Sequence, residues 1–596
     1  MSHTFHIPVL GLGFSIDTPL KVARYGIAST VSIVDDELIE RMREYHSIQN
    51  NLAYQPIKKT DQDHRAKRIT AYLNLLNLLV DKQFDNLKEQ AFEPNTEITR
   101  YFELLPENTN SKMRYNQMLS IADKDEKTLL ENQLRALLQK GAIDVNIMSK
   151  VDKVNYGKDG LSMGEKFTDA LASLRGFAES ELTSSLVLSA GMNPKLYSYL
   201  AEFADFFPAG LQAPTKKIIL KVSDFRSALI QAKFLAKKGL WIHEFRIESG
   251  LNCGGHAFAT EGYLLGPILE EFKQKRQSMI EELYALYLPV VKERFAFTPS
   301  IPITRITVQG GIGTSSENEF LQHYYNLDGT GWGSPFLLVP EATNVDQNTL
   351  NVLKDAEESD FYISAASPLG IPFNNFRKST AEIQRQERIA KGRPGSPCTK
   401  KFLVSNTEFT SQAICTASRE YQNLKIKELQ TKELSAADYN KQYASITEKL
   451  CLCEGLCTSA YTKNGMLKPR ENKAVAICPG PNTAYFSGIY SLDEMVKHIY
   501  GKVNLLLKAS RPNLFVNELK LYVDYLKKDI ENSLSNLSDK NLKRIENFRQ
   551  QLLNGIEYYQ TLLPLLLDKE AREMEEHLVN FKKELEALMV RAEVQL

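Results

Sequence analysis

The sequence predicts an α/β fold, a TIM (β/α)8 barrel with large helical insertions and a C-terminal helical extension. Eight apolar, β-branched segments have the composition of buried strands, and most are separated by segments with helical periodicity. Helical crossovers of this kind are what parallel neighbouring strands require. Glycine-rich loops follow several of the predicted strands, and the chain of 596 residues is longer than one typical barrel. A barrel with added helical units accounts for these features.

The predicted strands are spread unevenly along the chain, with a long interruption between the second and the third. Helical spacing of apolar residues separates several of them, as in Phe225–Lys238. In chain order the predicted strands are Ile7–Leu10, Ala28–Val34, Ser184–Ser189, Ala204–Phe207, Lys216–Val222, Trp241–Ser249, Ile303–Gln309 and Trp332–Leu338.

These patterns divide the chain into five segments. Residues 1–35 form the first part of the barrel, 36–181 a helical insertion, 182–390 the remainder of the barrel, 391–500 a cysteine-containing segment and 501–596 a helical bundle. In the first insertion, the stripe Tyr72, Leu75, Leu76 and Leu79 and the segment Glu126–Lys140 predict helices. A second helical insertion is expected at Glu261–Arg294. The first insertion could serve as a lid or docking surface, or be a plain helical addition to the barrel.

The stretch Asn252-Cys253-Gly254-Gly255-His256 directly follows the predicted strand that ends at Ser249. The two glycines allow the backbone to pass close to a flat ligand. An imidazole at the carboxyl end of a barrel strand is well placed to handle a proton beside a bound ring. The alternative is that His256 is an ordinary turn residue in a strand-to-helix loop.

Two glycine-rich loops follow the last two predicted strands. Gly310-Gly311-Ile312-Gly313 leads into Thr314-Ser-Ser-Glu317, which has the form of a helix capping box. Asp328-Gly-Thr-Gly331-Trp332-Gly333-Ser334 follows shortly after. Free N–H groups at such a helix start bind anions, and a (β/α)8 barrel builds its phosphate site from the loops after strands seven and eight. A phosphate is therefore expected between Gly310–Thr314 and Gly331–Ser334.

At these residues the chain resembles the nitronate monooxygenase family, also called 2-nitropropane dioxygenase-like, and the related flavin-dependent enoyl-acyl-carrier-protein reductases. The resemblance covers Ile7–Val34 and about Ser184–Leu338 and rests on Lys221, Cys253–His256, Gly310–Ile312 and Gly331–Phe336. It implies an FMN cofactor, with His256 as the catalytic base or substrate-orienting group. The residues expected to bind the cofactor are Gly11, Leu12, Gly13, Lys221, Gly254, Gly255, Gly310, Gly311, Gly313, Gly333 and Ser334.

The chain also departs from the pattern of this family. Trp332 and the pair Gly333-Ser334 stand where the eighth strand usually carries Gln and Gly-Thr, although the Ser334 hydroxyl can still donate to a phosphate. Ala257-Phe258 replace the Arg-Gly that commonly follows the histidine. The resemblance therefore does not carry over substrate specificity.

The resemblance implies an FMN-dependent oxidoreductase of the nitronate monooxygenase type, which acts on a small carbon acid and whose flavin is reoxidised by oxygen. One alternative is an NAD(P)H-dependent enoyl-thioester reductase of lipid or polyketide synthesis, with NAD(P)H and a carrier protein as partners. Another is a non-catalytic, barrel-derived binding protein, in which the cysteines and helices dominate.

Six of the seven cysteines follow the barrel, and three are crowded into Cys451-Leu-Cys453-Glu-Gly-Leu-Cys457. The spacing matches neither the paired Cys-x-x-Cys zinc pattern nor the common ferredoxin runs, so thiols without metal are expected. A metal bound with help from Cys398 or Cys478 is the alternative, and Cys415 completes the six. Cys253 either faces the ligand or fills a small core position.

Composition limits the partners. The chain carries 73 basic and 73 acidic residues with a pI of about 7.1, which argues against nucleic acid or an anionic membrane surface as its main partner. The sequence predicts neither a membrane span nor a signal peptide, so a cytoplasmic enzyme is expected. Apolar stripes near the C-terminus, such as Val516, Leu519 and Val523, predict three amphipathic helices. They would form a bundle that packs on the barrel or joins two subunits of a homo-oligomer.

Overall fold

The computed structural model describes residues 2–148, 152–157, 160–189, 191–210, 212–255, 262–506, 511–533 and 538–594. Its centre is a closed barrel of eight parallel strands that pair in chain order, so the predicted (β/α)8 barrel is confirmed. The barrel closes where Phe5 of the first strand pairs with Thr330 of the last. The strands are β1 (Phe5–Ile7), β2 (Ala28–Ser32), β3 (Ile143–Ile147), β4 (Ser184–Leu188), β5 (Lys216–Val222), β6 (Ile242–Glu248), β7 (Arg305–Gln309) and β8 (Gly329–Gly331).

Three strand predictions need correction. The third barrel strand, β3, lies inside the segment predicted as a helical insertion, and its Asp144 and Asn146 break the apolar pattern. Ala204–Phe207 is wrong as a strand, because residues 204–206 form a 3-10 turn. Strand β8 ends at Gly331, and the apolar run after it is a second 3-10 turn, Ser334–Leu338.

Five of the eight helices on the outside of the barrel, namely α2, α8, α9, α11 and α12, begin at side-chain caps that the sequence supplies. Asp224 accepts a hydrogen bond from Ser227 N at the start of α9, and Thr314 accepts one from Glu317 N at the start of α11. Each such cap contributes about 1 kcal/mol. The helices on the barrel are α1 (Thr18–Val22), α2 (Asp36–Gln49), α7 (Asp169–Ala178), α8 (Pro194–Leu200), α9 (Phe225–Ala236), α10 (Leu265–Phe295), α11 (Ser315–Tyr324) and α12 (Gln347–Lys354).

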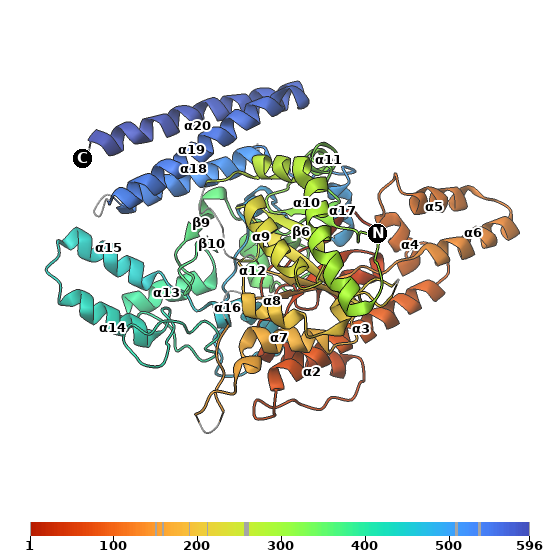
Figure 1. Cartoon of the computed structure of the whole chain (residues 1–596), viewed down its shortest axis with the longest axis horizontal. Helices are drawn as coiled ribbons and strands as arrows, with labels where there is room; N and C mark the ends of the chain where they lie inside the picture. The colour runs from red at the N-terminus through yellow and green to blue at the C-terminus, as the bar shows by residue number, and fades with distance from the viewer. Residues whose placement is uncertain are drawn as a thin grey trace.

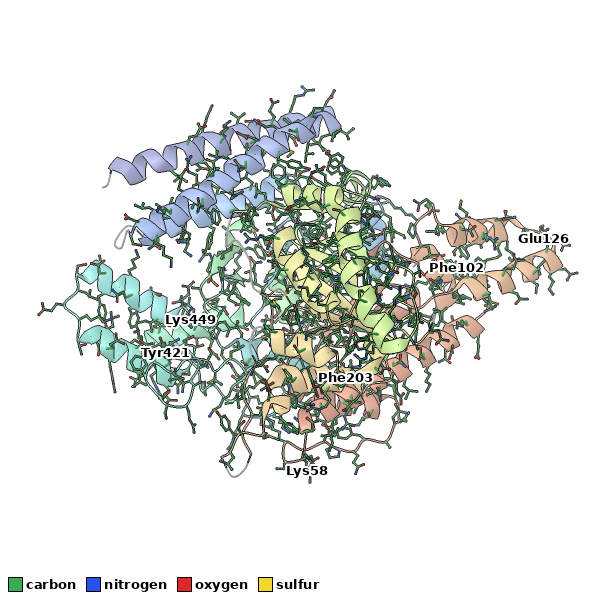
Figure 2. The ribbon with its side chains drawn as sticks, in the orientation of Figure 1. Lys58, Phe102, Glu126, Phe203, Tyr421 and Lys449 are labelled. Carbon is green, nitrogen blue, oxygen red and sulfur yellow. The ribbon has the colours of Figure 1, made fainter. Side chains whose placement is uncertain are left out.

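The first insertion is helical up to β3 and extends away from the barrel as an arm (Figure 1). Its helices are α3 (His64–Glu89), α4 (Glu97–Leu104), α5 (Asn110–Ser120) and α6 (Lys124–Leu137). The predicted stripe of Tyr72, Leu75, Leu76 and Leu79 is buried on α3, which packs against α2 and α7. Figure 2 labels Glu126 near the far tip of the arm.

The chain after β8 continues over the carboxyl ends of the strands. It contains the hairpin β9 (Phe361–Ser364) and β10 (Phe373–Phe376), whose strands are antiparallel. Helices α13–α15 lie at the left in Figure 1, opposite the arm. The helices of this segment are α13 (Thr380–Ala390), α14 (Arg419–Gln430), α15 (Ala436–Thr447), α16 (Leu452–Lys463) and α17 (Leu492–Ile499).

Three long helices end the chain, as the apolar stripes predicted. They are α18 (Leu514–Ser533), α19 (Asp539–Leu562) and α20 (Asp568–Val594), and each contacts the other two. The bundle lies over α10 and α11 at the top of Figure 1. In the described part of the chain, no helix combines the length and the apolar character that crossing a membrane requires.

Candidate functional site

A cavity lies at the carboxyl ends of the barrel strands, where enzymes of this fold place their active sites. Its volume is about 160 Å³. The cavity therefore has the size of a small ligand or a ring system.

The floor of the cavity is a hydrogen-bonded group of four side chains, Lys221, Glu248, Asn252 and Gln309. The Glu248 carboxylate accepts from Lys221 Nζ at 3.1 Å, from Asn252 Nδ2 at 2.6 Å and from Gln309 Nε2 at 2.8 Å. These residues come from the ends of β5, β6 and β7 and from the loop after β6. The carboxylate thus fixes three neighbouring side chains in one orientation.

Below the floor, the barrel interior holds a layer of buried charges. Arg246 lies between Glu244, at 2.8 Å, and Asp144, at 3.0 Å. Burial opposes ionisation of Glu244, but the positive charges of Arg246 and Arg305 prevail and lower its pKa to about 2. Burial, followed by the Arg246 charge, lowers the pKa of His6 to about 3, so this imidazole is neutral at pH 7. The layer gives the lower end of the cavity a rigid ionic base.

Three buried polar atoms on the cavity wall have no hydrogen-bond partner among the described residues: Ser32 Oγ, Asn146 Oδ1 and Asn252 Oδ1. Leaving a buried polar group unsatisfied costs about 1–3 kcal/mol. Because Asn252 Nδ2 donates to Glu248, its oxygen is held on the other side of the amide. A bound molecule with polar edges would supply the missing partners.

The opposite wall of the cavity, its roof, is apolar. Its residues come from chain segments that follow the barrel, so the roof is formed by tertiary contacts alone. Cys453 also lies there. The apolar roof residues are Leu369, Phe373, Phe402, Leu403, Leu452 and Leu456. A polar floor under an apolar roof suits a flat molecule with polar edges and apolar faces.

Five of the predicted cofactor-binding residues line this cavity: Gly11, Leu12, Lys221, Gly254 and Gly255. At Gly254 the backbone has φ 88°, and a Cβ would lie 2.1 Å from Val9 O, so only glycine fits there. The neighbouring Cys253 also lines the cavity and is buried, and burial raises its pKa to about 12. The structure thus brings these residues together.

Gly13 lies outside the cavity lining, and its N–H donates to Leu456 O at 3.0 Å. His256 lies outside the described residues, which end at Gly255 on this side of the loop. Its catalytic role stays a prediction.

The loops predicted to bind the FMN phosphate do not line the cavity and are filled by the chain itself. Gly313 N donates to Glu317 Oε2 at 2.9 Å, and Arg511 Nη2 donates to Gly311 O at 2.6 Å. The Glu317 carboxylate thus stands where an anion would bind the helix start, and it also accepts from Arg511 Nη1 at 2.7 Å. Gly310 faces the backbone of Asn252 instead of open space.

The second predicted phosphate loop is covered in the same way. Ser334 is buried, and Gly480 packs so closely that a Cβ on it would lie 2.5 Å from Ser334 Oγ. Gly333 packs against Cys253. As these side chains lie, the cavity matches a ring with polar edges, but the two loops do not accommodate a phosphate.

Several cavity residues were absent from the predicted site. Ser32, Asn146 and Arg246 lie on strands, and their only sequence signal is a polar residue within a short apolar run. The roof residues carry no local signal, because nothing in their own segments indicates that they meet the barrel.

The structure defines a (β/α)8 barrel with a cavity at the carboxyl ends of its strands. No family model matches the sequence, and no curated protein matches it. Among solved structures it is similar to the enoyl reductase domain of MlnA from the macrolactin biosynthesis cluster of Bacillus amyloliquefaciens, with 14% identity and a TM-score of 0.30. That similarity covers 68% of this chain and 87% of the other, and at this level it carries no argument about activity.

Proposed function

We propose that this chain is an oxidoreductase that binds a flavin-type ring in the cavity and acts on a small carbon acid. The observation that carries the proposal is the set of three unpartnered polar atoms, Ser32 Oγ, Asn146 Oδ1 and Asn252 Oδ1, beneath an apolar roof. A flat heterocycle with polar edges satisfies these atoms and buries its apolar faces in one placement.

The residues of the cavity would hold such a ring by its edge. Lys221 Nζ can donate to an electron-rich edge, and Asn252 Oδ1 and Asn146 Oδ1 can accept from ring N–H groups. Glu248 keeps Lys221 and Asn252 in place. When bound, the ring would supply the redox chemistry, and the protein would supply binding and orientation. His256 keeps its proposed role as the group that moves a proton on the substrate carbon.

A flavin titration tests the binding step. The purified protein is mixed with riboflavin and, separately, with FMN, and quenching of flavin fluorescence gives the two dissociation constants. Asn252→Ala should weaken binding roughly 10–100-fold, since it removes an acceptor and frees Glu248 from one donor. Asn116→Ala, on α5 in the arm, is the matched control and should bind like the wild type. Absence of flavin binding by the wild-type protein would refute the proposal.

Turnover assays then decide the substrate. Oxygen consumption with a simple alkyl nitronate is expected if the chain is of the nitronate monooxygenase type. Oxidation of NADPH in the presence of an enoyl thioester, without nitronate activity, would instead support the alternative function, that of an enoyl-thioester reductase. A protein that binds flavin yet turns over neither substrate would contradict the enzymatic part of the proposal.

A further inference from the structure

A buried carboxyl group of the C-terminal bundle holds both ends of the connection between β6 and α10. Glu518, on α18, is 1% exposed. Its Oε1 accepts from Ser249 Oγ at 2.9 Å and from Gly250 N at 3.3 Å, directly after β6. Its Oε2 accepts from Leu265 N at 2.7 Å, where α10 begins. Among the described residues no cation pairs with this carboxyl group, so donors of the connection itself surround it.

A short chain of hydrogen bonds leads from Glu518 to the cavity. The Ser249 hydroxyl donates to Glu518, and its oxygen accepts from Leu251 N at 3.1 Å. Asn252 N donates to Ser249 O at 3.1 Å and closes a turn. The turn brings Asn252 into the cavity lining, where its Nδ2 donates to Glu248 and its Oδ1 has no partner among the described residues. One hydroxyl group therefore connects the bundle to the cavity amide.

The bundle also packs closely on this turn. A Cβ on Gly250 would lie 2.5 Å from Cε1 of Tyr522, one helical turn beyond Glu518 on α18. A second contact between the bundle and α10 does not involve the turn, since Tyr559 OH accepts from Gly266 N at 3.2 Å. The two contacts can therefore be compared, because both attach the bundle and only one reaches the cavity.

A carboxyl group is a costly means of attaching one helix to another. Burying it without a cation is unfavourable, whereas apolar packing of α18 on α10 carries no such penalty. What Glu518 adds is two acceptor oxygens that meet donors from both ends of the connection. Its geometry thus fits the control of the turn better than plain attachment.

We propose that Glu518 is a positioning residue for the cavity, and that it holds the Ser249–Asn252 turn so that Asn252 Oδ1 faces the ligand. This inference rests on the proposed function, because it concerns how the site orients a flavin-type ring. The C-terminal bundle is then part of the framework of the cavity, although none of its residues lines it.

Hydrogen–deuterium exchange of the full-length protein without flavin tests the turn itself. In Glu518→Ala, a peptide covering residues 249–255 should exchange roughly tenfold faster than in the wild type, because Gly250 N loses its acceptor and the turn loosens. A peptide from β7 should be unchanged. If Glu518→Ala does not fold, Ser249→Ala breaks the same chain of hydrogen bonds and should accelerate the same peptide. Unchanged exchange of this peptide in a folded variant would overturn the proposal.

Riboflavin titration tests the effect on the cavity. Glu518→Ala should weaken binding roughly tenfold. Glu518→Gln should stay within about threefold of the wild type, because its oxygen can accept from Leu265 N while its amide nitrogen donates to Ser249 Oγ. Tyr559→Phe is the matched control: it removes the other contact with α10 and should bind riboflavin like the wild type. Equal losses of affinity in Tyr559→Phe and Glu518→Ala would show that bundle attachment alone matters, against the proposal.

The two experiments separate this inference from the proposed function. If the wild type binds no flavin, the proposed function fails, and the exchange experiment still decides whether Glu518 holds the turn. If the wild type binds riboflavin and Glu518→Ala binds it equally well, the positioning role is wrong and the proposed function stands.

Discussion

Arg511 donates a hydrogen bond to Glu317 across 2.7 Å, and both side chains are buried. The pair joins the start of α11 to the residues just before α18, and so attaches the C-terminal bundle to the barrel. The Glu317 carboxylate also accepts from Gly313 N, so it caps the helix start from within the chain. The Glu317 carboxylate thereby lies at the positive end of the α11 dipole, where the sequence predicts a bound phosphate.

Arg511→Ala should destabilise the protein strongly. The change leaves the buried Glu317 carboxylate without its cation, and breaking a buried pair from one side costs about 3–5 kcal/mol. Urea denaturation followed by circular dichroism measures the free energy of unfolding. Lys520→Ala, which removes an exposed ion pair with Glu358, is the control and should cost less than about 1 kcal/mol. Equal effects of the two changes would show that the buried pair is not a structural attachment.

Gly254→Ala and Gly255→Ala form a matched pair of variants at the cavity. A methyl group at Gly254 would lie 2.1 Å from Val9 O on a backbone with positive φ, whereas nothing lies within 4 Å of a Cβ at Gly255. Gly254→Ala should therefore lower the free energy of unfolding by several kcal/mol, in the exceptional range of about 4 kcal/mol. Gly255→Ala should change it by less than about 1 kcal/mol. Thermal unfolding of both variants checks this difference, which a similar melting temperature for the two would contradict.

Glu518 makes stability depend on pH. This α18 carboxylate is buried and accepts from Ser249 Oγ at 2.9 Å and from Leu265 N at 2.7 Å. Burial raises its pKa from 4.5 to about 7, against these hydrogen bonds. Between those two values the folded state keeps the proton that the unfolded state releases, so this group lowers stability as pH rises from about 4.5 to 7. The loss amounts to about 3 kcal/mol and is complete above pH 7.

Glu518→Gln should remove that dependence. Unfolding curves at a series of pH values between 4.5 and 8, for the wild type and the variant, give the difference in slope. Glu271→Gln, on the exposed face of α10, is the control and should keep the wild-type slope. A variant whose stability follows the wild type in parallel across this range would show that Glu518 does not titrate there.

Lys400 and Asp35 join the cysteine-containing segment to the start of α2. The Lys400 Nζ–Asp35 Oδ2 distance is 2.5 Å, both side chains are buried, and Cys457 Sγ lies 3.2 Å from the same oxygen. Lys400→Met should cost about 3–5 kcal/mol, because it strands the Asp35 charge. The double variant Lys400→Met, Asp35→Asn should recover part of that loss in a double-mutant cycle. Additive effects of the two changes would argue against a coupled pair.

The sequence was sufficient to predict the barrel and the approximate positions of six of its eight strands. Long apolar strands such as β5 and β6 were evident, because their β-branched residues are buried on both faces. Strand β3 was missed since Asp144 and Asn146 point polar groups into the barrel interior. Strand β8 has only Gly329–Gly331, which carries no apolar pattern, so the sequence predicts the eighth strand in the adjoining run Trp332–Leu338 instead.

The site was predictable where one local motif carried several of its residues. Gly254 and Gly255 follow a strand, and Lys221 ends the preceding strand, so the carboxyl ends of β5 and β6 could be recognised in advance. The contacts of Arg511, Gly480 and the roof residues with the barrel were not predictable. These residues are distant in the chain, and their own segments contain no sign of the surface they cover.

The order of these segments along the chain also determines when the cavity is completed during synthesis. The last barrel strand ends at Gly331, but the roof over its cavity needs Leu452 and Leu456, and Arg511 comes later still. At about 5–20 residues per second, a ribosome takes on the order of ten seconds to make the intervening chain. During that interval, a nascent barrel would expose an uncovered apolar rim, a target for chaperones. The cavity can then bind a ligand only after most of the polypeptide has been made.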